Sequence, residues 1–334
     1  MNSSRLQVEE YKKGILAGDR VVLAKAITLA ESTLVNDQRL AGDVLDAIIG
    51  HTGNSLRIGI TGAPGVGKST FIESFGKTIL ESGKKLAVLT VDPTSQLTSG
   101  SILGDKTRMQ ELAKDPRAFI RPTPSGPTLG GVAAYTRETM LLCEAAGYEI
   151  IIVETVGTGQ SEISIKNMVD FFLLLMQPGS GDELQGIKKG IVEMADAIAI
   201  TKADGENVNA AKATQAEFQH ALHLLHAPLS GWEPRVVTCS ALELKGLREI
   251  QSMIENFKQD LSASGYFQAN REAQQTEWLR DHFNLLLALD PKQFPQVIDA
   301  ERNLKDLVQS KKLSPRKAAQ DLLDIYHRAV RLKA

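Results

Sequence analysis

The chain has 334 residues, of which 43% are hydrophobic and 23% are charged. This composition is typical of a globular protein with one large core or two smaller ones. The formal net charge is only -2, so the overall charge gives no reason to expect nucleic acid or an anionic membrane as a partner.

The N-terminal residues MNSSRLQVEE contain no apolar signal-peptide core, and their acidic pair argues against a transit peptide. The most apolar run, FFLLLM at 171–176, has the length of a strand and cannot span a bilayer. We therefore expect a cytoplasmic protein without a membrane partner. Cys143 and Cys239 are far apart and fit no metal or redox motif, which indicates two small core residues.

Residues 5–53 show helical periodicity without turn clusters, with apolar residues recurring at positions such as Leu23, Ile27 and Ala30. This spacing predicts two or three amphipathic helices that pack onto the part of the chain that follows. We assign residues 1–54 to an N-terminal helical extension.

From about residue 55 to 260, apolar runs alternate with helical stretches. The runs predicted to be strands are residues 57–61, 86–91, 118–121, 150–154, 171–176, 197–201 and 235–238. Helical spacing is found near 69–82, 131–146, 208–225 and 246–260. Continuous apolar runs are typical of parallel strands covered on both faces. The pattern predicts a doubly wound α/β domain with ligand sites at the carboxyl ends of the strands.

A phosphate-binding motif, G-x-x-x-x-G-K-[ST], follows the first of these strands and opens a helix. It reads Gly62-Ala63-Pro64-Gly65-Val66-Gly67-Lys68-Ser69, and Thr70 comes next. A strand, a glycine-rich turn and a helix N-terminus place several backbone N–H groups around one point. Those donors and the Lys68 ammonium can hold a triphosphate, and the Ser69 hydroxyl can bind Mg²⁺. The motif therefore predicts nucleotide binding.

Acidic residues lie at the ends of two buried strands, Asp92 after one and Glu154 after another. The stretch that starts at Glu154 has the form D-x-x-G with glutamate in place of aspartate, and its Gly157 N–H can meet a γ-phosphate. A third acid, Asp105, lies in the polar segment 99–108, which can order around the same phosphate. We expect Ser69, Asp92, Asp105 and Glu154 to hold Mg²⁺, and Lys68 with the three acids to support catalysis.

The residue after Gly157 is Thr158, where many signalling GTPases carry a glutamine that orients the attacking water. Gln160 lies two residues further along the chain. We therefore expect slow hydrolysis that depends on help from a partner.

Base selectivity is suggested by two short motifs at later strand ends. Thr201-Lys202-Ala203-Asp204 resembles the N-K-x-D guanine signature, in which the aspartate accepts hydrogen bonds that only guanine can donate. Threonine is shorter than the usual asparagine, so we expect it to support the phosphate loop less well. Ser240-Ala241-Leu242 matches the S-A-[KL] element that contacts the guanine oxygen. Together the motifs favour GTP.

After residue 268 the strand pattern stops and helical segments follow at 269–289, 294–309 and 314–332. Ser314 and Pro315 form a good helix start. We assign residues 55–265 to the nucleotide-binding domain and 266–334 to a helical segment for dimerisation or partner docking. The alternative is that this segment only covers the sheet.

Five stretches resemble the MeaB/ArgK/MMAA family of G-protein chaperones of adenosylcobalamin-dependent methylmalonyl-CoA mutase. They are residues 62–70, 92–95, 100–109, 154–162 and 177–190. The resemblance covers nearly the whole chain. It implies a P-loop GTPase fold (SIMIBI-like) with a mostly parallel sheet, GTP/GDP and Mg²⁺ as ligands, and a homodimer. It also implies binding to the mutase, control of B12 cofactor loading, and protection of the mutase from inactivation. Gln177, Asp182 and Lys188 would belong to an additional switch segment that communicates with the mutase.

Three other functions stay open. An ATP-dependent kinase or ATPase linked to transport of Lys, Arg or ornithine is a role with which this family has also been labelled. A kinase should prefer ATP over GTP and needs a site for the molecule that accepts the phosphoryl group. A nickel-inserting GTPase would normally carry a His-rich tract or paired Cys and His. A scaffold with a vestigial nucleotide site conflicts with the intact Lys68, Ser69, Asp92 and Glu154.

Overall fold

The computed structural model describes residues 5–92, 109–124, 131–155, 161–180, 189–223 and 230–333. The chain forms two compact units, Met1–Gln274 and Gln275–Ala334. Each unit is described by itself below.

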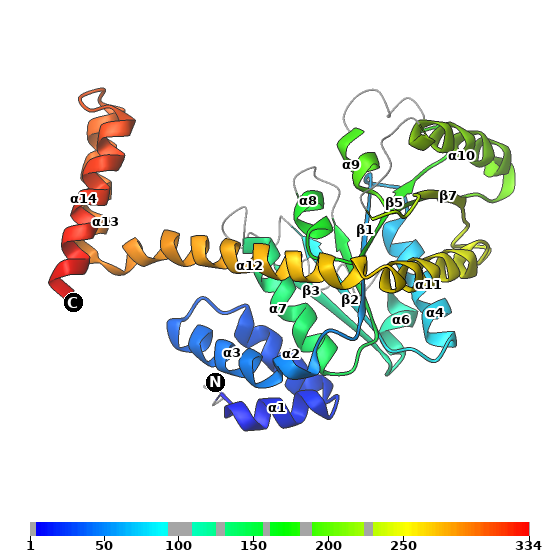
Figure 1. Cartoon of the computed structure of the whole chain (residues 1–334), viewed down its shortest axis with the longest axis horizontal. Helices are drawn as coiled ribbons and strands as arrows, with labels where there is room; N and C mark the ends of the chain where they lie inside the picture. Colours follow the sequence, from blue (N-terminus) through cyan, green and yellow to red (C-terminus); the bar gives the residue numbers. More distant parts are fainter. Residues whose placement is uncertain are drawn as a thin grey trace. The chain divides into compact units, whose positions relative to one another are not determined.

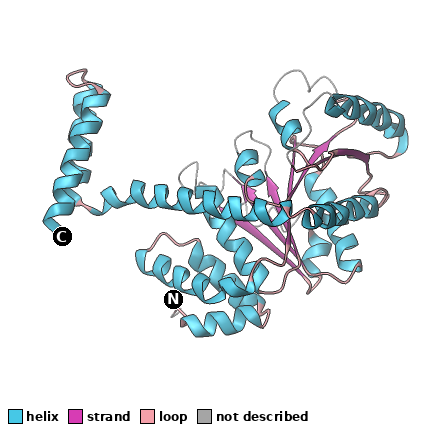
Figure 2. Cartoon of the chain, viewed as in Figure 1, coloured by secondary structure: helices cyan, strands magenta, loops and turns pink. Residues whose placement is uncertain are grey.

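The first unit is built on one sheet of seven parallel strands in the order β3-β2-β4-β1-β5-β6-β7 (Figures 1 and 2). The strands are β1 (Leu56–Gly62), β2 (Leu86–Asp92), β3 (Ala118–Pro124), β4 (Ile150–Thr155), β5 (Phe171–Met176), β6 (Ala197–Ile200) and β7 (Arg235–Thr238). Every predicted strand is present, and the predicted doubly wound α/β class is confirmed. The β4 and β5 residues are all buried, which explains their unbroken apolar sequences.

One face of the sheet is covered by three helices that share a single hydrophobic core with it. These are α4 (Lys68–Glu81), α6 (Gln110–Lys114) and α11 (Leu247–Ala263). Phe71 and Phe75 stack one turn apart on α4. Phe257 of α11 meets Phe171 of β5 edge to face. These aromatic side chains contribute much of the apolar area buried on this face.

The opposite face is covered by helices that lie between the strands in sequence. They are α7 (Gly131–Ala145), α8 (Ser161–Lys166), α9 (Lys189–Met194) and α10 (Val208–His223), with a short 3₁₀ turn, η3 (Gly205–Asn207), before α10. The short helices α6, α8 and α9 were not predicted, because five or six residues are too few to show a helical period.

The N-terminal extension consists of α1 (Val8–Leu16), α2 (Arg20–Ala30) and α3 (Val35–Ile48), followed by η1 (Ile49–His51). Asp19 caps α2 by accepting hydrogen bonds from the backbone N–H groups of Val21 and Val22. Buried residues such as Ile27 share a core with α7 and the sheet. The extension therefore packs onto the sheet domain, as the sequence predicts.

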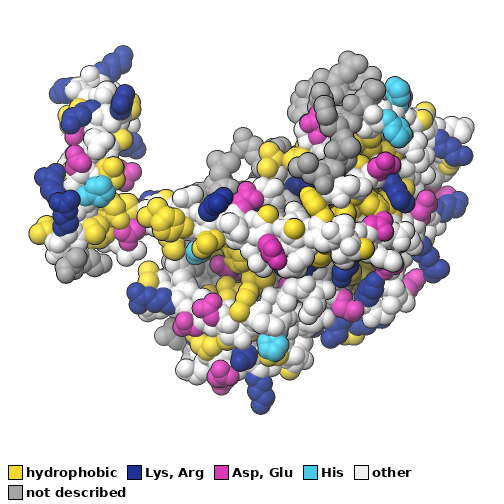
Figure 3. All heavy atoms as spheres, viewed as in Figure 1, with side chains coloured by type: hydrophobic (Ala, Val, Ile, Leu, Met, Phe, Trp, Pro, Cys, Tyr) yellow, Lys and Arg dark blue, Asp and Glu magenta, His cyan; other side chains and the backbone are white. Residues whose placement is uncertain are grey.

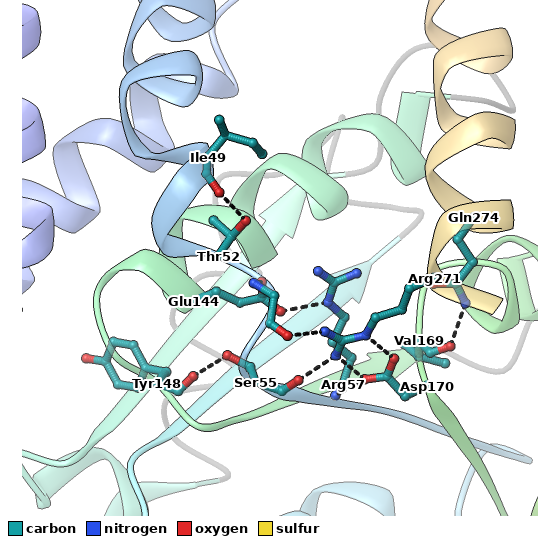
Figure 4. A network of polar contacts seen from close by, with 11 residues as sticks. Ile49, Thr52, Ser55, Arg57, Glu144, Tyr148, Val169, Asp170, Arg271 and Gln274 are labelled. Carbon is teal, nitrogen blue, oxygen red and sulfur yellow. Dashed lines mark hydrogen bonds and ion pairs between the residues drawn. The ribbon is translucent and has the colours of Figure 1, made fainter. Parts of the chain in front are cut away.

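A buried ion pair lies at the amino edge of the sheet, where α12 (Tyr266–Leu289) begins (Figure 4). Arg271 Nε donates to Asp170 Oδ1 and Nη2 to Asp170 Oδ2, both at 2.7 Å. The same guanidinium donates to the carbonyl oxygens of Gly53 and Ser55. Asp170 Oδ2 also accepts from the Arg57 N–H of β1 at 2.8 Å. One arginine thus joins α12, the loop before β1, and the start of β5.

A second pair extends this network toward α7. Arg57 Nε donates to Glu144 Oε1 at 2.8 Å, and the Gly53 N–H donates to Glu144 Oε2 at 2.7 Å. The Ser55 hydroxyl donates to the Tyr148 carbonyl (Figure 4). We call Arg57, Glu144, Asp170 and Arg271 the amino-edge network.

The second unit contains the C-terminal part of α12, the 3₁₀ turn η4 (Asp290–Gln293) and two helices, α13 (Pro295–Gln309) and α14 (Pro315–Lys333). Phe294, Val297 and Ala329 form its small core. The Tyr326 hydroxyl donates to Asp290 Oδ2. The helix start at Pro315 agrees with the prediction from Ser314 and Pro315, and α13 also begins at a proline, Pro295. In the described ranges, no helix is both long and apolar enough to cross a membrane.

Candidate nucleotide-binding site

The phosphate loop leaves the end of β1 at the centre of the sheet and enters α4. A Cβ at Gly62 would lie 2.6 Å from the Leu175 carbonyl oxygen of β5, so only glycine allows this close approach of two backbones. Gly67 precedes the first residue of α4 with φ 98°, a left-handed conformation that favours glycine. The two glycines shape the turn that the motif predicts.

Lys68, the first residue of α4, folds back over this loop. Its Nζ donates to the Gly62 carbonyl at 2.8 Å and to the Ala63 carbonyl at 3.2 Å. A lysine held in this way lies at the helix N-terminus, where backbone N–H groups and the helix dipole attract phosphate. The Gly62 and Ala63 carbonyls are neutral acceptors, so a phosphate oxygen can replace either of them as a partner of the ammonium.

Two of the four predicted metal ligands, Ser69 and Glu154, lie close together at the same edge. Ser69 Oγ is 3.5 Å from Glu154 Oε1, and Glu154 is only 7% exposed. Its register opposite Ile60 of β1 and Thr90 of β2 places Glu154 between the two strands. A hydroxyl next to a carboxylate is a donor set that suits a hard cation such as Mg²⁺.

Asp92 ends β2 at this edge of the sheet, and only its backbone is described. Three further predicted residues, Asp105, Gly157 and Gln160, lie outside the described residues, as does Thr158. Among the residues that the structure does describe, no group of three or more His, Cys, Asp or Glu side chains could hold a metal ion.

The guanine motif follows β6 and contacts the phosphate loop directly. Thr201 Oγ1 donates to the Val66 carbonyl at 2.8 Å and lies 3.1 Å from the Met176 carbonyl. Lys202, with φ 54°, donates from Nζ to the Gly65 carbonyl at 2.8 Å. Despite its shorter side chain, Thr201 therefore does support the loop.

The second base motif holds the first in place. Ser240 is fully buried, and its hydroxyl donates to Asp204 Oδ2 while accepting from the Glu243 N–H at 3.0 Å. The backbone groups of Ser240 and Lys245 bond each other and close the loop that contains Ala241 and Leu242. Two motifs that are far apart in sequence thus form one polar cluster beside the phosphate loop.

The switch residues Asp182 and Lys188 lie outside the described residues, whereas Gln177 is described. The turn that begins at Gln177 is closed by the Ser180 N–H and hydroxyl, both of which donate to the Gln177 carbonyl. The Gly179 N–H donates to Thr214 Oγ1 of α10 at 3.0 Å. Sequence reasoning missed Thr214, because nothing distinguishes it from other polar residues of that helix.

Both cysteines are buried, which agrees with their prediction as core residues. Burial raises the pKa of the Cys239 thiol to about 12 and that of Cys143 still further. Thiols with such raised pKa values are poor nucleophiles and poor metal ligands.

Comparison with known proteins identifies the family. Residues 23–289 match the family model described as methylmalonyl Co-A mutase-associated GTPase MeaB. GTPase ArgK of Escherichia coli K12 is 53% identical over 79% of this chain and 80% of its own length. The mouse protein named methylmalonic aciduria type A homolog, mitochondrial, is 43% identical over 96% of this chain and 79% of its own length.

A solved structure supports the same conclusion across nearly the whole chain. The crystal structure of LAO/AO transport system kinase is 40% identical, with a TM-score of 0.75, and the match covers 97% of this chain and 100% of that one. The fold, the phosphate loop and these likenesses agree with the resemblance read from the sequence. The chain belongs to the MeaB family of P-loop GTPases.

Proposed function

We propose that the protein binds GTP and Mg²⁺ and hydrolyses GTP to GDP and phosphate, slowly on its own and faster with a partner. The observation that carries the proposal is the cluster of Thr201, Lys202, Asp204 and Ser240 held against the phosphate loop. Asp204 accepts from Ser240 through one carboxylate oxygen. A carboxylate has further acceptor positions for the two N–H donors of guanine, and adenine offers no such pair.

In this proposal each residue has a defined task. Lys68 and the N–H groups at the start of α4 bind the β- and γ-phosphates. Ser69 and Glu154, with Asp92 and Asp105, would hold Mg²⁺, and the ion would supply positive charge beside the phosphates. The Gly157 N–H would meet the γ-phosphate.

The direct test measures GTP and ATP turnover by purified protein with and without Mg²⁺. Lys68→Ala should abolish GTP turnover, because the Lys68 ammonium lies on the phosphate loop at the start of α4, and a thermal melt of the nucleotide-free protein checks that the variant folds. Lys77→Ala is the matched control, since Lys77 lies on the same helix and pairs only with Glu73 in the described contacts. Full GTP turnover in a folded Lys68→Ala variant would refute the proposal.

We further propose methylmalonyl-CoA mutase, an adenosylcobalamin enzyme, as the partner whose cofactor loading the protein controls and which it protects from inactivation. Support comes from the family description, which names a mutase-associated GTPase, and from the name of the mouse relative. Gln177, Asp182 and Lys188 are the residues proposed to carry the nucleotide state to the mutase. GTP turnover of Asp182→Ala and Lys188→Ala, with and without mutase, tests this. Unimpaired stimulation in both variants would show that other residues carry the signal.

A second candidate is an ATP-dependent kinase or ATPase linked to amino-acid transport, favoured by the name of the solved relative. The two candidates differ in the base they require. Equal affinity for ATP and GTP, or phosphoryl transfer to an added acceptor protein, would support the kinase and contradict the GTPase proposal. The cytoplasm stays the predicted location for either function.

We also propose a homodimer formed through the C-terminal segment 266–334. Within the second unit, Leu279, Phe283, Leu286 and Leu287 of α12 are each more than half exposed, at 71%, 57%, 53% and 51%. Figure 3 shows hydrophobic side chains gathered on the visible face of this unit. This spacing forms one apolar stripe. Light scattering should give a dimer for the wild type and a monomer for Leu279→Lys/Phe283→Lys. The exposed polar control Gln296→Lys should stay dimeric, and a monomeric wild type would contradict the proposal.

A further inference from the structure

The strand β7 is the last of the sheet, and among the described residues β6 is its only strand neighbour. A groove with a volume of about 1000 Å³ lies along it. The groove is lined by the whole of β7, by residues 231–234 before it, and by side chains of α9, α10 and α11 (Figure 1). This volume is at the upper limit of pockets for small molecules. A groove that follows a strand suits an extended segment of chain. We call it the β7 groove.

The backbone of Val236 faces this groove. On the other side of β7, the Cys239 N–H donates to the Ile200 carbonyl of β6. Successive residues of a strand direct their N–H and C=O groups to opposite sides, so those of Val236 point away from β6. The contact of its carbonyl agrees with this, because it accepts from Gln215 Nε2 of α10 at 2.8 Å. Val236 is therefore the residue that an added strand would pair with.

Gln215 occupies part of the position of a neighbouring strand. Its side-chain amide donates to the Val236 carbonyl the bond that a backbone N–H of an added strand would donate. Exchanging one amide donor for another leaves the carbonyl bonded and costs little. A strand at the end of a sheet is a template for pairing with another chain, and a side chain over it limits unwanted pairing.

The β7 groove carries an excess of negative charge. Its charged lining comprises four exposed acids and one arginine, namely Glu193, Glu233, Glu249, Asp260 and Arg235. The Arg235 guanidinium lies over the Trp232 ring, 5.0 Å from its centroid. None of the described ion pairs involves Glu233, Glu249 or Asp260. The groove therefore favours a basic ligand over an acidic one.

The acids lie on both faces of the sheet. Glu193 belongs to α9 on one face, and Glu249 and Asp260 belong to α11 on the other. The side chains of an added strand alternate between these faces. A basic side chain can thus find a carboxylate whichever face it points to.

We propose that the β7 groove binds a basic, extended peptide segment of a partner protein, which pairs with Val236 as an eighth strand and displaces the Gln215 amide. Main-chain hydrogen bonds would supply affinity, and the acids would select basic side chains. The proposal is independent of nucleotide, because the groove lining contains none of the predicted nucleotide or metal residues.

Three fluorescein-labelled octapeptides test the ligand class by fluorescence anisotropy. The probe alternates lysine and valine, and the second peptide has glutamate in place of lysine. The third keeps the lysines but has an N-methyl group on every residue, so it keeps its charge and cannot pair as a strand. The probe should bind about tenfold or more tightly than either of the others. No binding of the probe, or equal binding of one of the other peptides, would overturn the proposal.

Variants of the protein test the groove itself, after thermal melts confirm that they fold. Glu249→Lys should weaken binding of the probe about three- to tenfold. Glu217→Lys makes the same charge change at an exposed position of α10 outside the groove lining, and should stay within about twofold of wild type. Equal weakening in both would mean attraction to overall charge alone, and would overturn the proposal.

Gln215→Ala tests the displaced amide. It leaves the Val236 carbonyl without the Gln215 donor, so the probe should bind about two- to tenfold more tightly than to wild type. Unchanged or weaker binding would contradict displacement of Gln215 and overturn the proposed pairing.

Nuclear magnetic resonance locates the peptide. In protein labelled with ¹⁵N-valine, the Val236 amide resonance should shift when the probe is added and stay in place with the N-methylated peptide. A bound probe without this shift would place the peptide elsewhere and overturn the proposal. A Val236 shift that appears when the protein alone is concentrated would place a second copy of this chain on β7, and would overturn the proposal of a separate partner.

Discussion

The two edges of the sheet hold charged side chains in opposite ways. At the amino edge, Arg271 and Asp170 are nearly inaccessible, with side-chain exposures of 7% and 1%, and they bond each other through two hydrogen bonds. At the carboxyl edge, Lys68 and Lys202 donate to neutral backbone carbonyls of the phosphate loop. Opposite charges neutralise each other at the first edge, whereas at the second Lys202 donates to a backbone carbonyl that a charged ligand can replace.

Among the residues that the structure describes, this difference makes the carboxyl edge the better candidate for a binding site. A buried ion pair whose charges bond each other has little to offer a ligand, and breaking it leaves a charge in a medium of low dielectric constant. A lysine on a carbonyl can exchange that partner for a phosphate at little cost, because both arrangements satisfy its donors. We therefore expect the amino edge to serve stability and the carboxyl edge to serve binding.

The largest expected effect follows from breaking the amino edge. Asp170→Ala leaves the Arg271 guanidinium buried without its carboxylate and removes the acceptor of the Arg57 N–H. The free energy of unfolding should fall by about 3–5 kcal/mol, measured by urea denaturation. The GTP to ATP affinity ratio of the remaining folded protein should not change, because the pair lies at the edge opposite the loop.

The matched control is Arg248→Ala. Arg248 also pairs with an acid, Glu81, but the two side chains are 86% and 65% exposed. Its removal should cost no more than about 1 kcal/mol. A similar loss of unfolding free energy in Asp170→Ala and Arg248→Ala would mean that burial does not increase the contribution of the amino-edge pair to stability.

Asp204→Asn should change nucleotide preference and leave stability nearly unchanged, the opposite of Asp170→Ala. The amide presents a donor where guanine also donates, so the affinity for GTP should fall by about 2–4 kcal/mol. Xanthosine triphosphate, which has a carbonyl at that place, should then bind better than GTP. The melt of the nucleotide-free protein should stay close to wild type. If wild-type protein binds ATP as tightly as GTP, this prediction fails without a variant.

The two edges also differ in how well the sequence predicts them. Strands such as β5 were predicted because a run of six apolar residues is typical of a strand buried on both faces. The phosphate loop was predicted because its backbone geometry requires glycine at fixed spacing. The family resemblance was confirmed as well, since its motifs are long.

The amino-edge network could not be predicted. Arg271 and Asp170 are 101 residues apart, and neither belongs to a motif, so only the folded chain brings them together. Thr201 was predicted to support the phosphate loop less well than asparagine, a comparison that the structure does not test. The structure brings the Val66 carbonyl within reach of the shorter hydroxyl.

A third prediction concerns a buried acid that belongs to neither edge. Glu138 of α7 is partly buried, and burial raises its pKa from 4.5 to about 7. Between these pH values the folded protein keeps a proton that the unfolded chain has lost. The contribution to stability is therefore complete below about pH 4.5 and is lost as pH rises to about 7, by about 1.4 kcal/mol per pH unit.

Glu138→Gln should remove this loss. Relative to wild type, its free energy of unfolding should increase as the pH is raised from about 4.5 to about 7, and then level off. The difference between variant and wild type is the quantity to measure, because other groups titrate in both. Glu217→Gln, at an exposed position on α10, is the control variant. A flat difference for Glu138→Gln would contradict the raised pKa.

The smallest expected effect is that of Ser240→Ala on nucleotide affinity at the carboxyl edge. Ser240 gives its one proton to Asp204 and accepts from the Glu243 N–H, so it orients the aspartate without touching the phosphate loop in the described contacts. Ser240→Ala removes both bonds but keeps the Asp204 charge. Affinity for GTP should fall by about 1 kcal/mol, the usual net contribution of one hydrogen bond, while affinity for ATP should hardly change. The resulting drop in the GTP to ATP ratio would resemble that of Asp204→Asn in direction and be smaller in size. An equal loss for both nucleotides would instead place Ser240 with Thr201, among the residues that shape the phosphate loop.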